Sequence, residues 1–306
     1  MTTRSEELRQ LEAADGVRLV YRRWLPEGAV RGTVQVVHGA SEHSGRYARL
    51  AGALTARGIA VAALDLRGHG RTAEATGPGR FGPGGGAALT ADVRALQEVA
   101  AAEHPGVPRV LLGHSMGSVV ALAAAEESGG DLAGLVLTGP IGVAPHLAES
   151  VAVLEASVAA GAGDASLDAL GAFNQPFEPA RTPFDWLSRD PAEVDAYLAD
   201  PYCGDRMPLT TAYAAGVFGL SVRAASEEGV AALPAGLPVL LLAGRRDPVG
   251  GVDAAQVTAL AGLLTARGLP VELHVYEDAR HEVLNETNRD EVTADLLTWL
   301  DARLGG

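Results

Sequence analysis

The pentapeptide Gly-His-Ser-Met-Gly at residues 113–117 constrains the fold of this chain more than any other segment. It follows the apolar run 110–112 and precedes the helix-forming run 118–125. A sharp turn between a strand and a helix would lift the Ser115 hydroxyl above the sheet edge, and small flanking residues let the two elements approach closely. The pattern predicts a nucleophile elbow, although a glycine-bearing turn with an incidental serine would match the same five residues.

Short apolar runs alternate with segments of helical periodicity along most of the chain. Segments 6–13 and 17–24 are expected to pair as an antiparallel hairpin across Asp15-Gly16, a strong turn signal. Further strands are predicted at 33–37, 59–64, 110–112, 134–137, 239–242 and 271–276, and helices at 47–57, 87–103, 116–126, 253–267 and 289–304. Buried strands interleaved with helices predict an α/β protein whose mainly parallel eight-stranded sheet is flanked by helices.

The alternation stops between residues 141 and 233, where helical patterns occur without a strand signal. A helix is expected at 146–160, and another apolar run covers 213–220. Loops at the carboxyl ends of parallel strands face the ligand site, so this segment is predicted to form an α-helical lid. The predicted organisation is a core of residues 1–140 and 234–306 with a lid or cap at 141–233. A separate helical domain with no role over the site is the alternative.

Composition narrows the classes of function. The 306 residues are 47% hydrophobic and carry a formal net charge of -14, which argues against electrostatic binding to nucleic acid or an anionic membrane. No apolar run reaches membrane-spanning length and the first ten residues lack an apolar signal core, so a cytoplasmic location is expected. The single cysteine, Cys203, excludes an internal disulfide and gives no metal cluster, which is typical of a reducing compartment.

Residues 77–86 are rich in glycine and proline and invite comparison with phosphate-binding loops. They lack the Lys-Ser/Thr pair of a P-loop, and their prolines remove amide donors. We interpret this segment as a flexible surface loop.

A serine hydroxyl is a weak nucleophile that needs a base to take its proton and an acid to orient the base. Among the eight histidines, His281 lies just after the last predicted strand, in residues 278–282, where a loop can carry it over the sheet edge. Asp247 follows the preceding strand, which gives the chain order Ser115, Asp247, His281 that is typical of such elbows. Asp253 is the alternative acid, although a helix N-cap explains it, and Asp278 would share a turn with the base and hold the ring poorly.

Two backbone amides are expected to form an oxyanion hole beside the serine. The amide of Met116 follows the nucleophile at a helix N-terminus, where the helix dipole favours negative charge. The amide of Ala40, in the loop after the 33–37 strand, is the natural second donor.

With these motifs the chain resembles α/β-hydrolases of the monoacylglycerol lipase and lysophospholipase group, which is also classed with serine aminopeptidase-like hydrolases. The segments that carry the resemblance are 38–47, 65–70, 113–117, 244–247 and 279–286. The resemblance implies Ser115 as nucleophile, His281 as base, Asp247 as orienting acid, and the amides of Ala40 and Met116 as oxyanion hole. The chain departs from the family at Ser118, where a third glycine is usual, and in the insertion, where few residues align with a headgroup-binding role.

The predicted function is hydrolysis of carboxylic esters through an acyl-enzyme, with no metal and no cofactor. Apolar residues of the insertion could line an acyl pocket, although packing within the lid also explains them: Phe173, Phe177, Trp186, Tyr213, Val217, Phe218 and Leu220. The expected partners are small-molecule acyl esters, such as monoacylglycerols or lysophospholipids, and not nucleic acid. Transient contact with lipid aggregates and the oligomeric state are left open. Amide or peptide hydrolysis, acyl transfer by the same triad, and a non-catalytic ligand-binding homologue are the alternatives.

Overall fold

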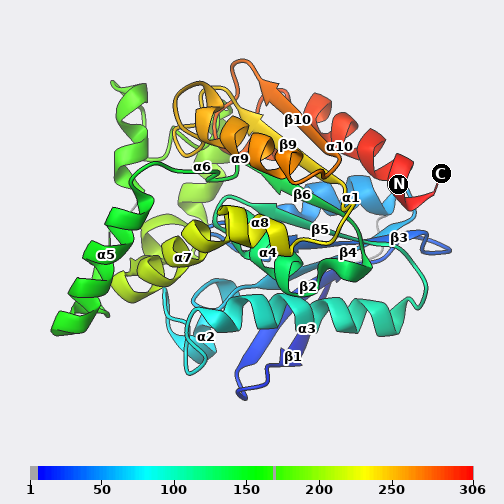
Figure 1. Cartoon of the computed structure of the whole chain (residues 1–306), viewed down its shortest axis with the longest axis horizontal. Helices are drawn as coiled ribbons and strands as arrows, with labels where there is room; N and C mark the ends of the chain where they lie inside the picture. Colours follow the sequence, from blue (N-terminus) through cyan, green and yellow to red (C-terminus); the bar gives the residue numbers. More distant parts are fainter. Residues whose placement is uncertain (1–5, 168–169, 306) are drawn as a thin grey trace.

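An eight-stranded sheet crosses the centre of the molecule, with helices on both faces (Figure 1). The computed structural model describes residues 6–167 and 170–305. The strands, in spatial order, are β1 (Glu7–Glu12), β2 (Arg18–Trp24), β4 (Ile59–Asp65), β3 (Gly32–Val37), β5 (Arg109–His114), β6 (Leu132–Thr138), β9 (Val239–Gly244) and β10 (Val271–Tyr276). β2 runs antiparallel to β1 and to β4, and every other pair is parallel, which confirms the predicted fold class.

Alternate side chains of the buried strands pack into two hydrophobic layers, one on each face of the sheet. The helices that cover the sheet are α1 (Ala48–Thr55), α3 (Ala87–Glu103), α4 (Met116–Ser128), α9 (Ala255–Ala266) and α10 (Arg289–Leu304), and a short α2 (Ala73–Thr76) precedes α3. Leu111 of β5 packs with α3, α4 and α9, whereas its neighbours Val110 and Leu112 pack with α1 and α10. This burial on both sides explains why β5 is apolar without alternation.

The predicted helices agree closely with those of the structure. Segments 87–103 and 289–304 coincide with α3 and α10 at both ends. α9 begins later than predicted, because Val252–Ala254 form a 3-10 turn before it. Within the described residues, no helix combines the length and hydropathy that a membrane span requires.

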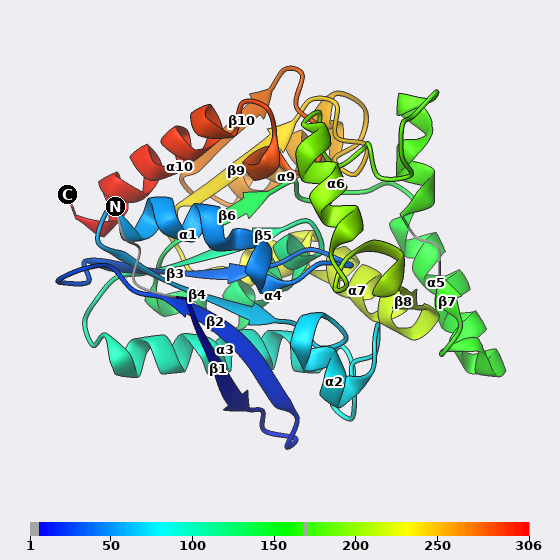
Figure 2. The same cartoon turned by 180° about the vertical axis from the view of Figure 1, so that it is seen from behind.

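The chain leaves the sheet after β6 and returns at β9, the neighbouring parallel strand. The intervening segment contains α5 (Leu147–Ser157), α6 (Pro191–Ala199), α7 (Thr211–Ala224) and α8 (Glu227–Ala232). It also contains β7 (Ser166–Leu167) and β8 (Leu209–Thr210), which pair with each other, so the expectation of a segment without strands is wrong. Two-residue strands are too short to show periodicity. Figures 1 and 2 place α5, α6 and α7 together at the end of the molecule opposite the chain termini.

The glycine-rich segment 77–86 lies mostly at the surface, as predicted, but part of it packs against the segment between β6 and β9. Gly79 is buried, its carbonyl accepts the Thr210 hydroxyl at 2.6 Å, and a Cβ on Gly79 would lie 2.1 Å from the carbonyl oxygen of Pro208. The Phe81 ring stacks on Tyr213 with centroids 4.1 Å apart. Glycine is therefore needed at position 79 because the backbones of the two segments approach each other closely there.

Candidate active site

Ser115 occupies the turn between β5 and α4, with φ 52° and ψ -122°. A positive φ is uncommon for a residue with a Cβ and marks local strain. The strained turn is held from the neighbouring strand, because the Ser115 N–H donates to the carbonyl of Thr138 at 2.9 Å. The geometry is that of the predicted elbow.

The glycines on either side of the elbow have no room for a side chain. A Cβ on Gly113 would lie 2.3 Å from the carbonyl oxygen of Gly117, and a Cβ on Gly117 would lie 2.1 Å from that of Val37. Ser118, at the position where a third glycine is usual, donates its hydroxyl to the carbonyl of Ser115 at 2.5 Å. This substitution therefore adds a hydrogen bond within the first turn of α4.

His281 and Asp247 form a buried pair at the ends of neighbouring strands. Nδ1 of His281 lies 2.9 Å from Oδ2 of Asp247, and the residues are 2% and 1% exposed. The second carboxylate oxygen accepts the N–H of Val249 at 2.8 Å, which fixes the carboxylate. Burial disfavours the charged imidazole, but the adjacent carboxylate outweighs it and raises the pKa of His281 above its usual range.

The two other acids that the sequence offers lie elsewhere. Asp253 is exposed and has a left-handed φ of 54° in the 3-10 turn before α9, so it is not the expected N-cap. The side chain of Asp278 is 71% exposed and lies 3.9 Å from Arg189. Only Asp247 of these three acids contacts the His281 ring.

The residues expected to form an oxyanion hole lie beside the serine. Ala40 and Met116 line the same cavity as Ser115. Within the described residues, neither backbone amide donates to a protein acceptor, whereas the N–H of the preceding Gly39 donates to Glu42 at 2.5 Å. The helix N-terminus at Met116 leaves its amide free, as the first residues of any helix do.

The elbow opens into an apolar cavity of about 220 Å³. Four of the seven predicted pocket residues line it: Phe173, Trp186, Val217 and Phe218. The lining that sequence reasoning missed comprises Ile141, Ala144, Leu147, Leu170, Leu209, Ala214, Pro248, Val249 and Gln256. Pro248 and Val249 directly follow the acid, so their position after a parallel strand was a signal that could have identified them.

Three predicted pocket residues do not line this cavity. The Phe177 ring lies 4.2 Å below the guanidinium of Arg280. Tyr213 is fully buried and donates its hydroxyl to the carbonyl of Arg67 at 2.9 Å. Leu220 packs against the hydrophobic layer on the α4 face.

The segment between β6 and β9 is hydrogen-bonded to the turn that carries Ala40. Ser41, with φ 54°, accepts from the hydroxyl of Tyr197 and from the N–H of Gly204, each at 2.9 Å, through its carbonyl. Its own hydroxyl donates to the carbonyl of Met207 at 2.9 Å. This part of the segment is therefore bonded to the site rather than resting loosely over it.

The same segment also contacts the loop that carries His281, the predicted base. The N–H of His281 donates to the Trp186 carbonyl at 3.4 Å, and the N–H of Glu282 donates to the Leu187 carbonyl at 2.8 Å. The Trp186 and His281 rings pack with centroids 4.9 Å apart. Trp186 thus contributes both to the cavity wall and to the surroundings of the His281 ring.

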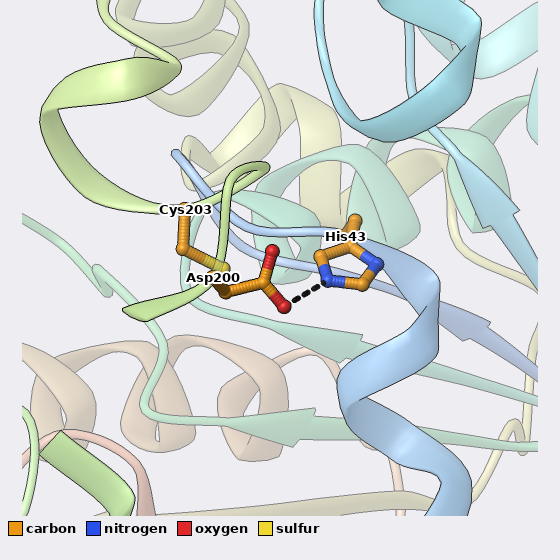
Figure 3. Close-up of side chains that lie close together, drawn as sticks. All are labelled: His43, Asp200 and Cys203. Atoms are coloured by element: carbon orange, nitrogen blue, oxygen red, sulfur yellow. Dashed lines mark hydrogen bonds and ion pairs between the residues drawn. The ribbon is translucent and has the colours of Figure 1, made fainter. Parts of the chain in front are cut away.

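His43, Asp200 and Cys203 form a cluster whose nitrogen, oxygen and sulfur atoms lie within 4.8 Å of one another. Figure 3 shows the His43 ring and the Asp200 carboxylate pointing toward each other, with Nε2 and Oδ2 3.0 Å apart. Nδ1 accepts the N–H of Gly45 at 3.2 Å, so Nε2 carries the proton and is not free to ligate a metal. Burial raises the pKa of the Cys203 thiol, which opposes the thiolate that metals prefer. These residues do not fit a metal ion; they join the turn after β3 to the α6 region.

The strand order, with the elbow after the central strand β5 and the His-Asp pair after β9 and β10, defines the class: the chain is an α/β-hydrolase. Residues 28–288 match the family model described as serine aminopeptidase, S33, and the chain belongs to that family.

Known lipases and esterases are similar to this chain over nearly its whole length, which supports the assignment. The chain is 35% identical to a monoacylglycerol lipase of Mycolicibacterium smegmatis, with 99% of both chains covered. It is 32% identical to a monoglyceride lipase of Homo sapiens, covering 97% of this chain and 91% of that protein. The solved structure of a thermostable carboxyl esterase from Bacillus coagulans, in complex with glycerol, superposes with a TM-score of 0.91 at 29% identity, covering 99% of this chain and 100% of the other. The chain is therefore a serine ester hydrolase of the esterase and lipase type.

Proposed function

We propose that this hydrolase cleaves long-chain monoacylglycerols, or closely related single-chain acyl esters, through an acyl-enzyme on Ser115. The observation that carries the proposal is the apolar cavity, whose lining, among the residues that the structure describes, is apolar except for the side chains of Ser115, Gln256 and Trp186. Each buried methylene contributes about 0.8 kcal/mol, so such a cavity favours an acyl chain over a polar ligand. The relatives described as monoacylglycerol and monoglyceride lipases support the same substrate class.

In the proposed mechanism His281 takes the proton of the Ser115 hydroxyl as its oxygen attacks the ester carbonyl. The amides of Ala40 and Met116 stabilise the tetrahedral oxyanion. The imidazolium then gives its proton to the departing alcohol, leaving the acyl group on Ser115. Water, deprotonated by His281, attacks this ester, and the free acid leaves as the serine regains its proton.

Asp247 has an electrostatic and an orienting role in this proposal. Its carboxylate accepts a hydrogen bond from the Nδ1–H of His281, which leaves the lone pair of Nε2 available to the serine. The same contact raises the pKa of His281 and so favours the imidazolium that forms during attack.

We infer further that residues 141–233 act as a cap over the serine. Most of the cavity lining comes from this segment, including Leu170, Trp186 and Phe218. The hydrogen bonds from Ser41 to the α6 region support a cap of which one part is anchored. A cytoplasmic location and transient contact with lipid aggregates stay predictions.

The test combines active-site labelling with a substrate panel. A fluorophosphonate should label the wild-type protein but not Ser115→Ala, whereas Ser128→Ala should label normally. Ser128 lies on the same helix, and its hydroxyl contacts only the Ala124 carbonyl within the described residues, at 3.2 Å. Hydrolysis should increase with acyl length across monoacylglycerols. Faster cleavage of matched anilides than of esters would instead favour the amidase alternative, and equal labelling of wild type and Ser115→Ala would refute the catalytic role.

A further inference from the structure

A buried arginine links the two loops that carry the proposed oxyanion hole and the proposed base. Arg46 lies in the 3-10 turn Ser44–Tyr47 before α1, and its guanidinium contacts two carboxylates. It lies 3.0 Å from Oε2 of Glu42 and donates to both oxygens of Glu282 at 2.5 and 2.7 Å. The three side chains are only 11%, 3% and 5% exposed. A guanidinium is suited to such a bridge, because its fixed fork matches carboxylate geometry.

The Glu42 end of this bridge holds the turn after β3. Oε1 of Glu42 accepts the N–H of Gly39 at 2.5 Å and the Tyr47 hydroxyl at 2.9 Å. A Cβ on Gly39 would lie 2.9 Å from this oxygen, so the carboxylate packs directly on the turn. Because Gly39 immediately precedes Ala40, the position of Glu42 sets the direction of the Ala40 amide.

The Glu282 end of the bridge holds the loop of the base. Glu282 is the residue after His281, and its carboxylate also accepts the side-chain amide of Asn285 at 2.9 Å. Its backbone N–H donates to the Leu187 carbonyl. The position of Glu282 therefore constrains the backbone on which the His281 ring is mounted.

Burial by itself would favour neutral carboxylic acids at both ends of the bridge. The Arg46 charge, together with the nearby His114, outweighs burial: the pKa of Glu42 is lowered to about 2, and the pKa of Glu282 is also lowered. Both carboxylates are thus charged at neutral pH, and each needs the shared guanidinium. Neither Arg46 nor its two partners line the apolar cavity.

We propose that Arg46 is a positioning residue for ester hydrolysis: it fixes the distance between the oxyanion turn (residues 38–42) and the base loop (residues 279–286). The inference rests on the proposed function. Arg46 forms ion pairs with Glu42 and Glu282, and its guanidinium also lies 4.8 Å from the centre of the Tyr197 ring. Loss of the two ion pairs affects the alignment of the oxyanion donors and the base with the serine. The loss of Arg46 should leave acyl-chain binding unchanged, because Arg46 does not line the apolar cavity.

The experiment compares Arg46→Lys, which keeps the charge but loses the fork, with Glu282→Gln and with the control Arg49→Lys. Arg49 is 47% exposed and also contacts the base loop, through Asn285, but it does not reach Glu42. Since a misplacement of about 1 Å can cost about 100-fold in rate, kcat of Arg46→Lys should fall by about 10- to 100-fold. KM for a long-chain ester should stay within about twofold, and the Arg49→Lys control should match wild type in both constants.

An alkyl boronic acid gives a readout that a merely structural role would not change. It forms a tetrahedral adduct with an active serine, so its inhibition constant should weaken in step with the fall in kcat/KM. A folded Arg46→Lys with kcat within about twofold of wild type overturns the proposal. A fall in kcat/KM that comes from a higher KM rather than from a lower kcat also overturns it. If Arg46→Lys does not fold, Glu282→Gln decides by the same criteria, because Arg46 then keeps Glu42 as its charged partner. Failure of the wild type itself to hydrolyse esters would instead refute the proposed function.

Discussion

Replacing Gly117 with alanine tests whether close packing of the elbow positions the serine. A Cβ at Gly117 would lie 2.1 Å from the carbonyl oxygen of Val37 and 2.4 Å from that of His38. Both are backbone atoms at the end of β3 and cannot rotate away. Since real Cβ contacts essentially never fall under 3.0 Å, the N-terminus of α4 must move from β3 by about 0.9 Å.

This movement separates the Ser115 hydroxyl and the Met116 amide, which α4 carries, from the Ala40 amide, which follows β3. A displacement of about 1 Å can cost about 100-fold in rate, so kcat for an ester should fall about 100-fold. Overpacking destabilises by about 1–3 kcal/mol, and replacing a helical glycine returns about 0.5–1 kcal/mol. The free energy of unfolding should therefore fall by about 1–2 kcal/mol, which leaves the protein folded.

The assay measures kcat and KM with a p-nitrophenyl ester, and the free energy of unfolding by urea titration. Gly262→Ala is the matched control, because Gly262 lies in α9 and a Cβ added there would meet no neighbouring atom within 4 Å. This control should gain up to about 1 kcal/mol of stability and keep its kcat. A folded Gly117→Ala with kcat within about twofold of wild type would refute the reasoning.

Three further predictions concern the base, the cavity and a buried acid. Because Asp247 raises the pKa of His281, kcat/KM should fall in acid with a midpoint above the usual value of about 6.5; a flat profile from pH 5 to 8 would contradict the role of this base. Phe218→Ala removes cavity surface worth about 1.5–3 kcal/mol, so KM for a long-chain ester should rise by about 10- to 150-fold, whereas Phe177→Ala, outside the cavity, should leave it within about twofold; equal effects would argue against the acyl pocket. Burial raises the pKa of Glu126 from 4.5 to about 7 despite the opposing Arg223, so its favourable contribution is full below pH 4.5 and is lost as the pH rises through 7. The free energy of unfolding of Glu126→Gln, measured by thermal unfolding relative to wild type, should therefore be about 1–2 kcal/mol more favourable at pH 8.5 than at pH 5.5. The same difference between the two proteins at both pH values would contradict this account.

The elbow was predictable from sequence because its requirements are local. Glycines are required two residues before and after Ser115, because a Cβ there would lie 2.3 or 2.1 Å from a backbone oxygen, and the pentapeptide with its flanking strand and helix patterns carries the signal. The pairing of His281 with Asp247 was predictable for a different reason. Parallel strands bring their carboxyl ends to one edge, so residues in the loops just after β9 and β10 are brought together whatever lies between them.

The cavity lining was only partly predictable, because residue type shows that a side chain is buried but not what it is buried against. Phe173 and Phe177 are alike in sequence, yet the first lines the cavity and the second stacks on Arg280. The pairing of β7 with β8 and the packing of the glycine-rich loop also depend on contacts between distant segments. Arg46 and Glu282 are 236 residues apart in the sequence, so no local sequence pattern predicts their ion pair.

The central claim is that Ser115 carries the acyl group during ester hydrolysis. The most direct measurement mixes the enzyme rapidly with a p-nitrophenyl ester, quenches it in acid, and locates the added acyl mass by peptide mapping. The account predicts a burst of p-nitrophenol close to one per active site, with the acyl mass on the peptide that contains Ser115. Acyl mass on another residue, or hydrolysis retained in Ser115→Ala at the wild-type rate, would contradict it.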